Sequence, residues 1–118
     1  MSDFRSLPAY QKGFKMAMEV FLVSKSFPDD EANNLTRQFR TSARTVCAHI
    51  AQAYAKRAMR TSYVGSISDA EMENSSLKVW VDFAYACQYI NKAIHTSLTN
   101  KSEEVSQLLQ QMSRQWMD

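Results

Sequence analysis

Apolar residues recur at three- and four-residue steps along most of the chain, which is the period of an amphipathic α-helix. The first apolar face comprises Leu7, Tyr10, Phe14, Met18 and Phe21. Pro8 suits the first turn of this helix, and the segment SFPDD at residues 26–30 ends it. The pattern therefore predicts a first helix that ends before residue 28.

A second helix is predicted to begin in PDDEANN, residues 28–34, where Asp29, Asp30 and Glu31 supply N-terminal caps and complement the positive end of the helix dipole. No helix-breaking residue follows until about Arg60. Its predicted apolar face consists of Ala32, Leu35, Phe39, Ala43, Val46, Ile50 and Ala53.

The next turn is predicted in RTSYVGSISDAE, residues 60–71, with Ser66 or Ser68 as the cap of a third helix. The apolar residues of that helix are Leu77, Trp80, Val81, Ala84, Cys87, Asn91, Ile94 and Leu98, with the polar Asn91 interrupting the line. Asn100 and Glu103 have the spacing of a capping box, which predicts a short fourth helix there. Its apolar stripe is Val105, Leu108, Leu109, Met112 and Trp116.

These elements predict an all-α fold in one domain that spans residues 1–118. The chain has 2 glycines and 2 prolines in 118 residues, a composition that favours long helices. The second and third helices, at about 30 residues each, would each span roughly 45 Å. The simplest arrangement that buries their apolar faces is an antiparallel up-and-down four-helix bundle.

Charge is concentrated on the second helix. Residues 32–60 contain six basic residues and no acidic one: Arg37, Arg40, Arg44, Lys56, Arg57 and Arg60. At about 100° per residue the three arginines fall within roughly 60° of each other, so they form a strip that can follow a phosphate backbone. The alternative is that they pair with acidic residues of a neighbouring helix or subunit, such as Glu73 and Asp82. The sequence leaves both interpretations open.

Between Arg44 and Lys56 the second helix carries no formal charge for three turns. A helix without charge on any side is usually buried on every side, and one bundle covers only part of it. We therefore expect this segment to contact another subunit, with Thr45, His49 and Gln52 as a polar seam between the copies. The expected subunit interface consists of Thr45, Cys47, Ala48, His49, Ala51, Gln52 and Ala55.

The sequence offers little for catalysis. His49 and His95 are the only histidines and have no metal-ligand spacing, and two glycines cannot build a phosphate-binding loop. We expect no catalytic residue, metal, cofactor or small-molecule substrate, and we interpret Cys47 and Cys87 as reduced, buried side chains. Without a signal-peptide pattern or an apolar run of about 18 residues, the chain is expected to be cytoplasmic, with no membrane partner.

Several short motifs resemble one protein family when taken in order. They include Tyr10-Gln11-Lys12, Phe27-Pro28 with Glu31, Leu35 with Gln38 and Arg40, the run from Val46 to Ala53, and the strings Trp80 to Ala84 and Cys87 to Ile90. Their order and spacing over residues 4–98 resemble the proteins encoded in intervening sequences of bacterial 23S ribosomal RNA genes. The chain departs from the family pattern where Thr41 replaces an arginine, His49 an asparagine and Gln52 a glutamate, and where Ser76-Leu77 replace the Glu-Thr that precedes the tryptophan.

The resemblance implies a homopentamer of four-helix bundles without enzymatic activity and with an RNA-binding role. It also implies kinship with the accessory variability proteins of diversity-generating retroelements, which assist a reverse transcriptase. We expect RNA or a ribonucleoprotein as the partner, bound through the arginine strip with Lys56, Arg57 and Arg60 as a second cluster. The alternative is a protein-interaction scaffold whose basic surface binds a protein such as a reverse transcriptase.

Overall fold

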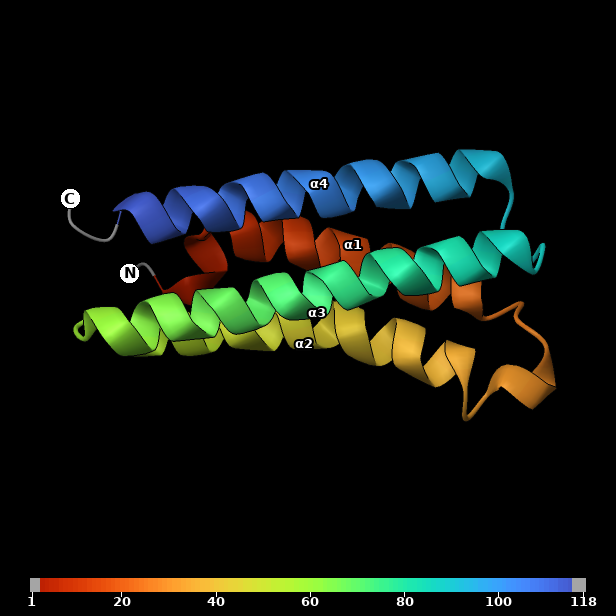
Figure 1. Ribbon diagram of the computed structural model, residues 1–118, viewed down its shortest axis with the longest axis horizontal. Helices are drawn as coiled ribbons and strands as arrows, with labels where there is room; N and C mark the ends of the chain where they lie inside the picture. The colour runs from red at the N-terminus through yellow and green to blue at the C-terminus, as the bar shows by residue number, and fades with distance from the viewer. Residues whose placement is uncertain (1–2, 116–118) are drawn as a thin grey trace.

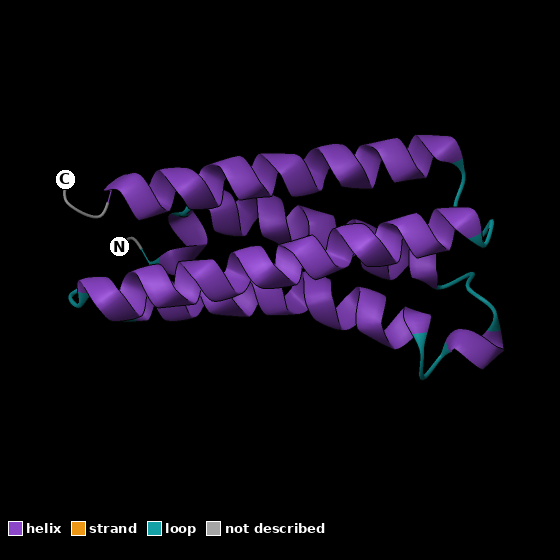
Figure 2. Ribbon diagram, viewed as in Figure 1, coloured by secondary structure: helices purple, strands orange, loops and turns teal. Residues whose placement is uncertain are grey.

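The computed structural model of the protein describes residues 3–115, which form an elongated bundle of 45 × 25 × 25 Å (Figure 1). Its four long helices are α1 (Pro8–Ser24), α2 (Leu35–Ala55), α3 (Arg60–Ala86) and α4 (Lys92–Gln115). Two short 3-10 helices, η1 (Phe4–Ser6) and η2 (Asp29–Glu31), precede α1 and α2. Within these described residues the secondary structure is entirely helical, and short loops join the helices (Figure 2). The predicted all-α four-helix bundle is confirmed.

The helices follow one another around the bundle, and each neighbour in sequence is a neighbour in space. α1 packs on α2 and α4, and α3 packs on the same two helices from the other side. α1 and α3 therefore lie across the bundle diagonal from each other, as do α2 and α4. This arrangement gives every helix one inward face and one outward face.

The core runs along the whole bundle axis and contains side chains from all four helices. The predicted apolar face of α2 is confirmed from Leu35 to Ala53, whereas Ala32 lies before the helix and is exposed. One polar contact lies inside this core: Asn74 Nδ2 donates to the Ser102 carbonyl at 2.9 Å, and Ser102 Oγ donates back to Asn74 Oδ1 at 2.9 Å. This reciprocal pair satisfies both side chains and fixes α3 against α4. The largest fully buried apolar side chains are Phe39, Met16, Ile50, Leu77, Leu98, Leu109, Val20, Val46, Val81 and Val105.

The predicted inward face of the first helix is only partly confirmed: Leu7 and Tyr10 pack against the core, but Phe14 and Met18 do not. Phe14 and Met18 are exposed, and the buried positions of α1 are Ala9, Gly13, Met16, Val20 and Ser24. A Cβ added at Gly13 would lie 3.3 Å from Cys47 Sγ, so this face lets α1 approach α2 closely. α1 has apolar residues on two sides. The side that contains Gly13 faces the core, because it lets α1 pack closely on α2.

Two predicted helix starts also differ from the structure. α2 begins at Leu35, because the acidic residues form η2 instead, and Glu31 Oε1 accepts a hydrogen bond from the Leu35 amide at 3.2 Å. The following turn lies at residues 56–59, so α3 begins at Arg60 and Gly65 lies within it. Ser66 and Ser68 are therefore residues of α3 and not its caps.

The boundary between the third and fourth helices was predicted too late in the chain. α3 ends at Ala86, where Gln88 adopts a left-handed φ of 65° and the Tyr89 amide donates to the Ala84 carbonyl at 2.9 Å. This is the hydrogen bond of a Schellman ending with glutamine in the place where glycine is usual. Asn91 Oδ1 then caps α4 by accepting from the Ile94 amide at 2.8 Å. The fourth helix is thus long, and Asn100 and Glu103 lie inside it. Trp116 lies outside the described residues.

Candidate nucleic-acid interface on α2

The three arginines of the predicted strip project from the side of α2 that points away from the core. Arg37 and Arg44 are exposed, and Arg40 is half-buried where α2 meets α1. We call Arg37, Arg40 and Arg44 the arginine face. Seven residues separate its ends, which corresponds to about 10 Å along the helix.

Contacts with α1 hold the inner part of this face in place. Arg40 Nε donates to Ser24 Oγ at 2.7 Å, and Ser24 Oγ donates to the Phe21 carbonyl at 3.1 Å. The guanidinium carbons of Arg40 and Arg44 lie 4.9 and 5.7 Å from the centre of the Phe21 ring. Lys25 Nζ lies 4.9 Å from the same ring centre. Phe21 therefore gathers three cations at the α1–α2 junction through cation–π contacts.

Sequence reasoning missed the contribution of α1 to this site. The apolar pattern predicts Phe21 on the inward face of the first helix and predicts no role for Lys25. The available signal was the spacing of Phe21 and Lys25, four residues apart on one side of a helix. What the sequence did not provide was the register that brings this pair against Arg40 and Arg44.

The arginine face is not neutralised within the described part of the chain. None of its three guanidinium groups lies within 4.0 Å of a carboxylate in residues 3–115. Of the two acidic residues considered as partners, Asp82 Oδ1 contacts His95 Nε2 at 2.9 Å. Glu73 and Arg37 line the same hollow of about 300 Å³ between α2 and α3 without forming an ion pair. Like charges that lack a local counter-charge attract anions, such as phosphate groups.

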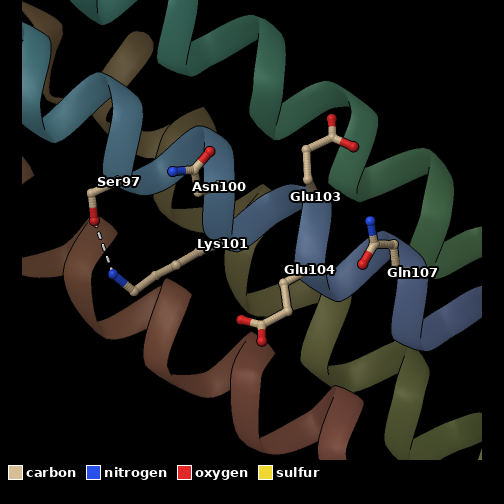
Figure 3. Close-up of a pocket in the computed structure, with 6 residues that line it drawn as sticks. All are labelled: Ser97, Asn100, Lys101, Glu103, Glu104 and Gln107. Carbon is tan, nitrogen blue, oxygen red and sulfur yellow. Dashed lines mark hydrogen bonds between the residues drawn. The ribbon is translucent and has the colours of Figure 1, made fainter.

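The charged surface of α4 shows the opposite arrangement. A hollow of about 680 Å³ lies along its outer side. Figure 3 shows that Lys101 donates a hydrogen bond to Ser97, which lies on the same helix. Lys101 Nζ also lies 2.8 Å from Glu19 Oε1. Glu103 and Glu104 pair with Lys78 at 2.7 Å and Lys12 at 3.6 Å. The charges of Lys101, Glu103 and Glu104 in the middle of α4 are thus paired locally, whereas those of the arginine face add up. The hollow is lined by Ser97, Asn100, Lys101, Glu103, Glu104 and Gln107.

The second predicted basic cluster, Lys56, Arg57 and Arg60, lies at the α2–α3 turn, and all three residues are exposed. Arg57 Nη1 donates to the Tyr54 carbonyl at 2.8 Å, and its guanidinium carbon lies 4.1 Å from the centre of the Tyr54 ring. Twelve residues, or about 18 Å of helix, separate Arg44 from Lys56. The two basic clusters are therefore distinct sites joined by the uncharged segment.

The residues of the uncharged segment, 45–55, differ in their exposure to solvent. Cys47 is buried inside the chain's own bundle against Gly13, so the expectation that another subunit would cover this residue is wrong. α1 supplies the cover that the sequence argument assigned to a second copy. Of the other expected interface residues, Ala48, Gln52 and Ala55 are exposed, and Thr45, His49 and Ala51 are half-buried.

His49 and Gln52 contact each other within one helix, with His49 Nδ1 and Gln52 Oε1 3.1 Å apart. Part of the predicted polar seam is therefore already satisfied within the chain. Burial raises the pKa of the Cys47 thiol to about 11, which keeps it protonated at neutral pH. Cys87 is exposed at the end of α3, so the expectation that both cysteines are buried is wrong for this one.

The described residues also limit other kinds of site. In residues 3–115, no group of three or more His, Cys, Asp and Glu side chains is placed to hold a metal ion. No helix in that part of the chain is long and apolar enough to cross a membrane.

Comparisons with known proteins agree with the fold described above. A crystal structure at 1.70 Å of a protein of unknown function from the S23 ribosomal protein family of Bacteroides thetaiotaomicron VPI-5482 superposes with a TM-score of 0.80. The two sequences are 19% identical, and the match covers 90% of this chain and 95% of that one. A search of curated protein sequences found no significant match. The sequence model of the 23S rRNA-intervening sequence proteins matches residues 5–111. This chain therefore belongs to the 23S rRNA-intervening sequence protein family.

Proposed function

We propose that the protein is a non-enzymatic homo-oligomer, a pentamer by the family resemblance, that binds RNA through the arginine face of α2. The observation that carries the proposal is the absence of a carboxylate within ion-pair distance of Arg37, Arg40 and Arg44 in the described residues. Arginines without a carboxylate partner can pair with the phosphate groups of RNA. Contacts between basic side chains and phosphates supply most of the free energy of RNA binding without sequence preference. We also propose that the protein is cytoplasmic, in the same compartment as the RNA that it would bind.

Phe21 and the geometry of Arg40 support this proposal further. Arg40 is held by Ser24 and by the Phe21 ring, so its guanidinium group loses little conformational freedom when it binds a phosphate. Arg44 and Lys25 share the same ring and present two more cations beside it. A strand that follows α2 would therefore meet a prearranged group of cations.

The second basic cluster extends this surface in the proposal. Lys56, Arg57 and Arg60 lie at the α2–α3 turn, and Lys56, just after the end of α2, is about 18 Å from Arg44 along the helix. In an oligomer with closed symmetry, each copy would contribute both clusters to the assembly surface, so a weak local charge would be multiplied by the number of copies.

The test is the salt dependence of binding to a mixed-sequence single-stranded RNA, measured by fluorescence anisotropy. Each phosphate contact contributes about 0.7 to the slope of log K against log salt concentration. The double variant Arg40→Glu with Arg44→Glu should lower that slope by about 1.4 and the affinity roughly 25-fold at about 0.1 M salt. The oligomer mass should not change.

A matched control makes the same change of charge on α4. Lys92 and Arg114 are exposed at the two ends of that helix, so Lys92→Glu with Arg114→Glu should leave RNA affinity within about twofold. Absent or salt-independent binding by the intact oligomer would contradict the proposal. If the same α2 variants instead lost a protein partner such as a reverse transcriptase, the arginine face would be a protein-docking surface.

A further inference from the structure

Two helices present apolar side chains outward, where the bundle does not cover them. On α1 these are Phe14, Met18 and Leu22, which follow at four-residue steps and are 50%, 42% and 58% exposed. We call them the α1 outer face. An apolar hollow of about 400 Å³ adjoins Phe14 at the start of the helix. Single exposed apolar residues are ordinary on a protein surface, but an aligned row of large ones marks a contact surface.

The second apolar row lies on α3. Met72, Val79 and Phe83 are 61%, 46% and 54% exposed and share the outward side of that helix. We call them the α3 outer face. Between and beside them the same side carries the small residues Gly65, Ser68 and Ser75. A helix side that combines large apolar and small uncharged residues favours close packing of another helix on it.

The two outer faces lie on opposite sides of one chain, because α1 and α3 are diagonal in the bundle. No contact inside the chain can therefore bring them together. A second copy can, and we propose that the α1 outer face of one copy packs on the α3 outer face of the next copy, head to tail. This inference rests on the homo-oligomer proposed above and identifies the surfaces that would form it.

The charges beside the two faces favour a contact between an α1 outer face and an α3 outer face over a contact between two copies of the same face. Lys15 and Lys25 flank the α1 outer face, and α1 as a whole has two basic residues and one acidic residue. α3 has four acidic and two basic residues, with Asp69 and Asp82 beside its outer face. A contact between two α1 faces would place lysines together, and a contact between two α3 faces would place carboxylates together. The head-to-tail contact avoids both repulsions.

The heights of the two faces also suit a closed ring. Cyclic symmetry allows rotation but no shift along the symmetry axis, so in a ring whose bundles are parallel to that axis the contacting faces lie at the same level of the bundle. On α2, Cys47 lies beside Gly13 of α1, and Arg40 bonds Ser24 of α1. Ser42, between those two positions, accepts from Trp80 Nε1 of α3 at 3.0 Å. The α1 outer face and the middle of the α3 outer face therefore share one level.

One consequence links this contact to RNA binding. A ring built through α1 and α3 leaves the outward sides of α2 and α4 free of the contact. Rotation then places the arginine faces of all copies on the same side of the assembly, inner or outer. The contact would thus align the three arginines of each copy into one repeated basic surface.

The test uses two variants that each damage one face. Met18→Glu places a charge in the α1 outer face, and Val79→Glu places one in the α3 outer face. Each variant should have the mass in solution of one 13.5 kDa chain. Each variant keeps the face that the other has lost. Mixing them should therefore give a one-to-one dimer and nothing larger, as measured by light scattering coupled to size-exclusion chromatography.

Several results decide the matter. A monomeric wild-type protein, full-size oligomers of both variants, or no dimer on mixing would each overturn the head-to-tail contact. Gln107→Glu, on the outward side of α4, is the control and should keep the wild-type mass. Leu22→Lys with Phe83→Asp repeats the complementation if one glutamate variant fails to fold, as judged by circular dichroism. RNA binding is scored separately, because its loss in an intact oligomer concerns the arginine face alone.

Discussion

The two diagonals of the bundle differ in what they present outward. α1 and α3 carry rows of large apolar side chains, whereas α2 and α4 carry charged and polar ones. All four helices bury a similar apolar face toward the common core, so the difference does not arise from folding of one chain. The domain therefore has two kinds of surface, and in our proposal α1 and α3 form the contacts between copies while α2 and α4 stay accessible to other molecules.

The polar diagonal itself contains a second difference. On α4, Lys101 is bonded to Glu19, and Glu103 and Glu104 are paired with lysines of α3 and α1. On α2, Arg40 and Arg44 lie against the Phe21 ring, and no residue of the described chain pairs an acidic group with the arginine face. A surface with paired charges has little field beyond it, and a surface with unpaired like charges has a strong one. This is why we propose RNA binding for α2 and not for α4.

The largest expected effect compares the inward and outward sides of α1. Met16 is fully buried and Met18 is 42% exposed, so the same residue type occurs on both sides. Met16→Ala should lower the free energy of unfolding by about 2–5 kcal/mol, because it leaves a cavity in the core. Met18→Ala should cost less than about 1 kcal/mol in the dissociated chain. Urea unfolding at low protein concentration measures both, and equal losses would contradict the orientation of α1.

A smaller effect is expected for Gly65, which lies inside α3 on its outward side with no atom within 4 Å of an added Cβ. Gly65→Ala should raise the free energy of unfolding by about 0.5–1 kcal/mol, because alanine loses less conformational freedom in a helix. Thermal unfolding followed by circular dichroism measures this. Destabilisation would indicate that α3 starts after this residue, as the sequence had suggested.

The two cysteines provide a chemical test of the same packing. Cys47 is buried with its pKa raised to about 11, so at pH 8 nearly all of it is the unreactive thiol. Cys87 is exposed. A thiol reagent should label one cysteine per folded chain at pH 8 and two after unfolding in urea. Equal labelling rates of both cysteines in the folded protein would contradict the contact of α1 with α2.

The smallest effect is expected on the outward side of α2. Ala48 is exposed and shares that side with Arg37 and Arg44. If copies meet through α1 and α3, Ala48→Glu leaves the oligomer mass unchanged. A loss of mass would return the subunit contact to the uncharged segment of α2, where the sequence had placed it.

Prediction from the sequence succeeded where a helix has a single apolar face, so that only one side of it can face the core. The apolar face of α2 from Leu35 to Ala53 is a single uninterrupted row, and all of it is buried. The three basic residues of the arginine face lie on one side of α2, as their spacing predicted, and RNA binding through them stays a prediction. Prediction failed at the α3–α4 boundary, because the ending at Gln88 uses no glycine and the apolar period continues through it. There the turn is held by long-range contacts, including the hydrogen bond from Tyr89 to Glu31 at 2.9 Å.

The sequence by itself determined the helical composition, the antiparallel bundle and the concentration of positive charge on α2, because these depend on period and composition within single segments. Only the tertiary structure decided which apolar side of α1 faces the core. Both sides have helical spacing, and the choice depends on how closely Gly13 lets α1 approach Cys47. The same packing brought Phe21 and Lys25 to the arginine face and left Phe14, Met18 and Leu22 outside. Periodicity within one helix carries no information on the shape of its neighbour, and that shape determined the site.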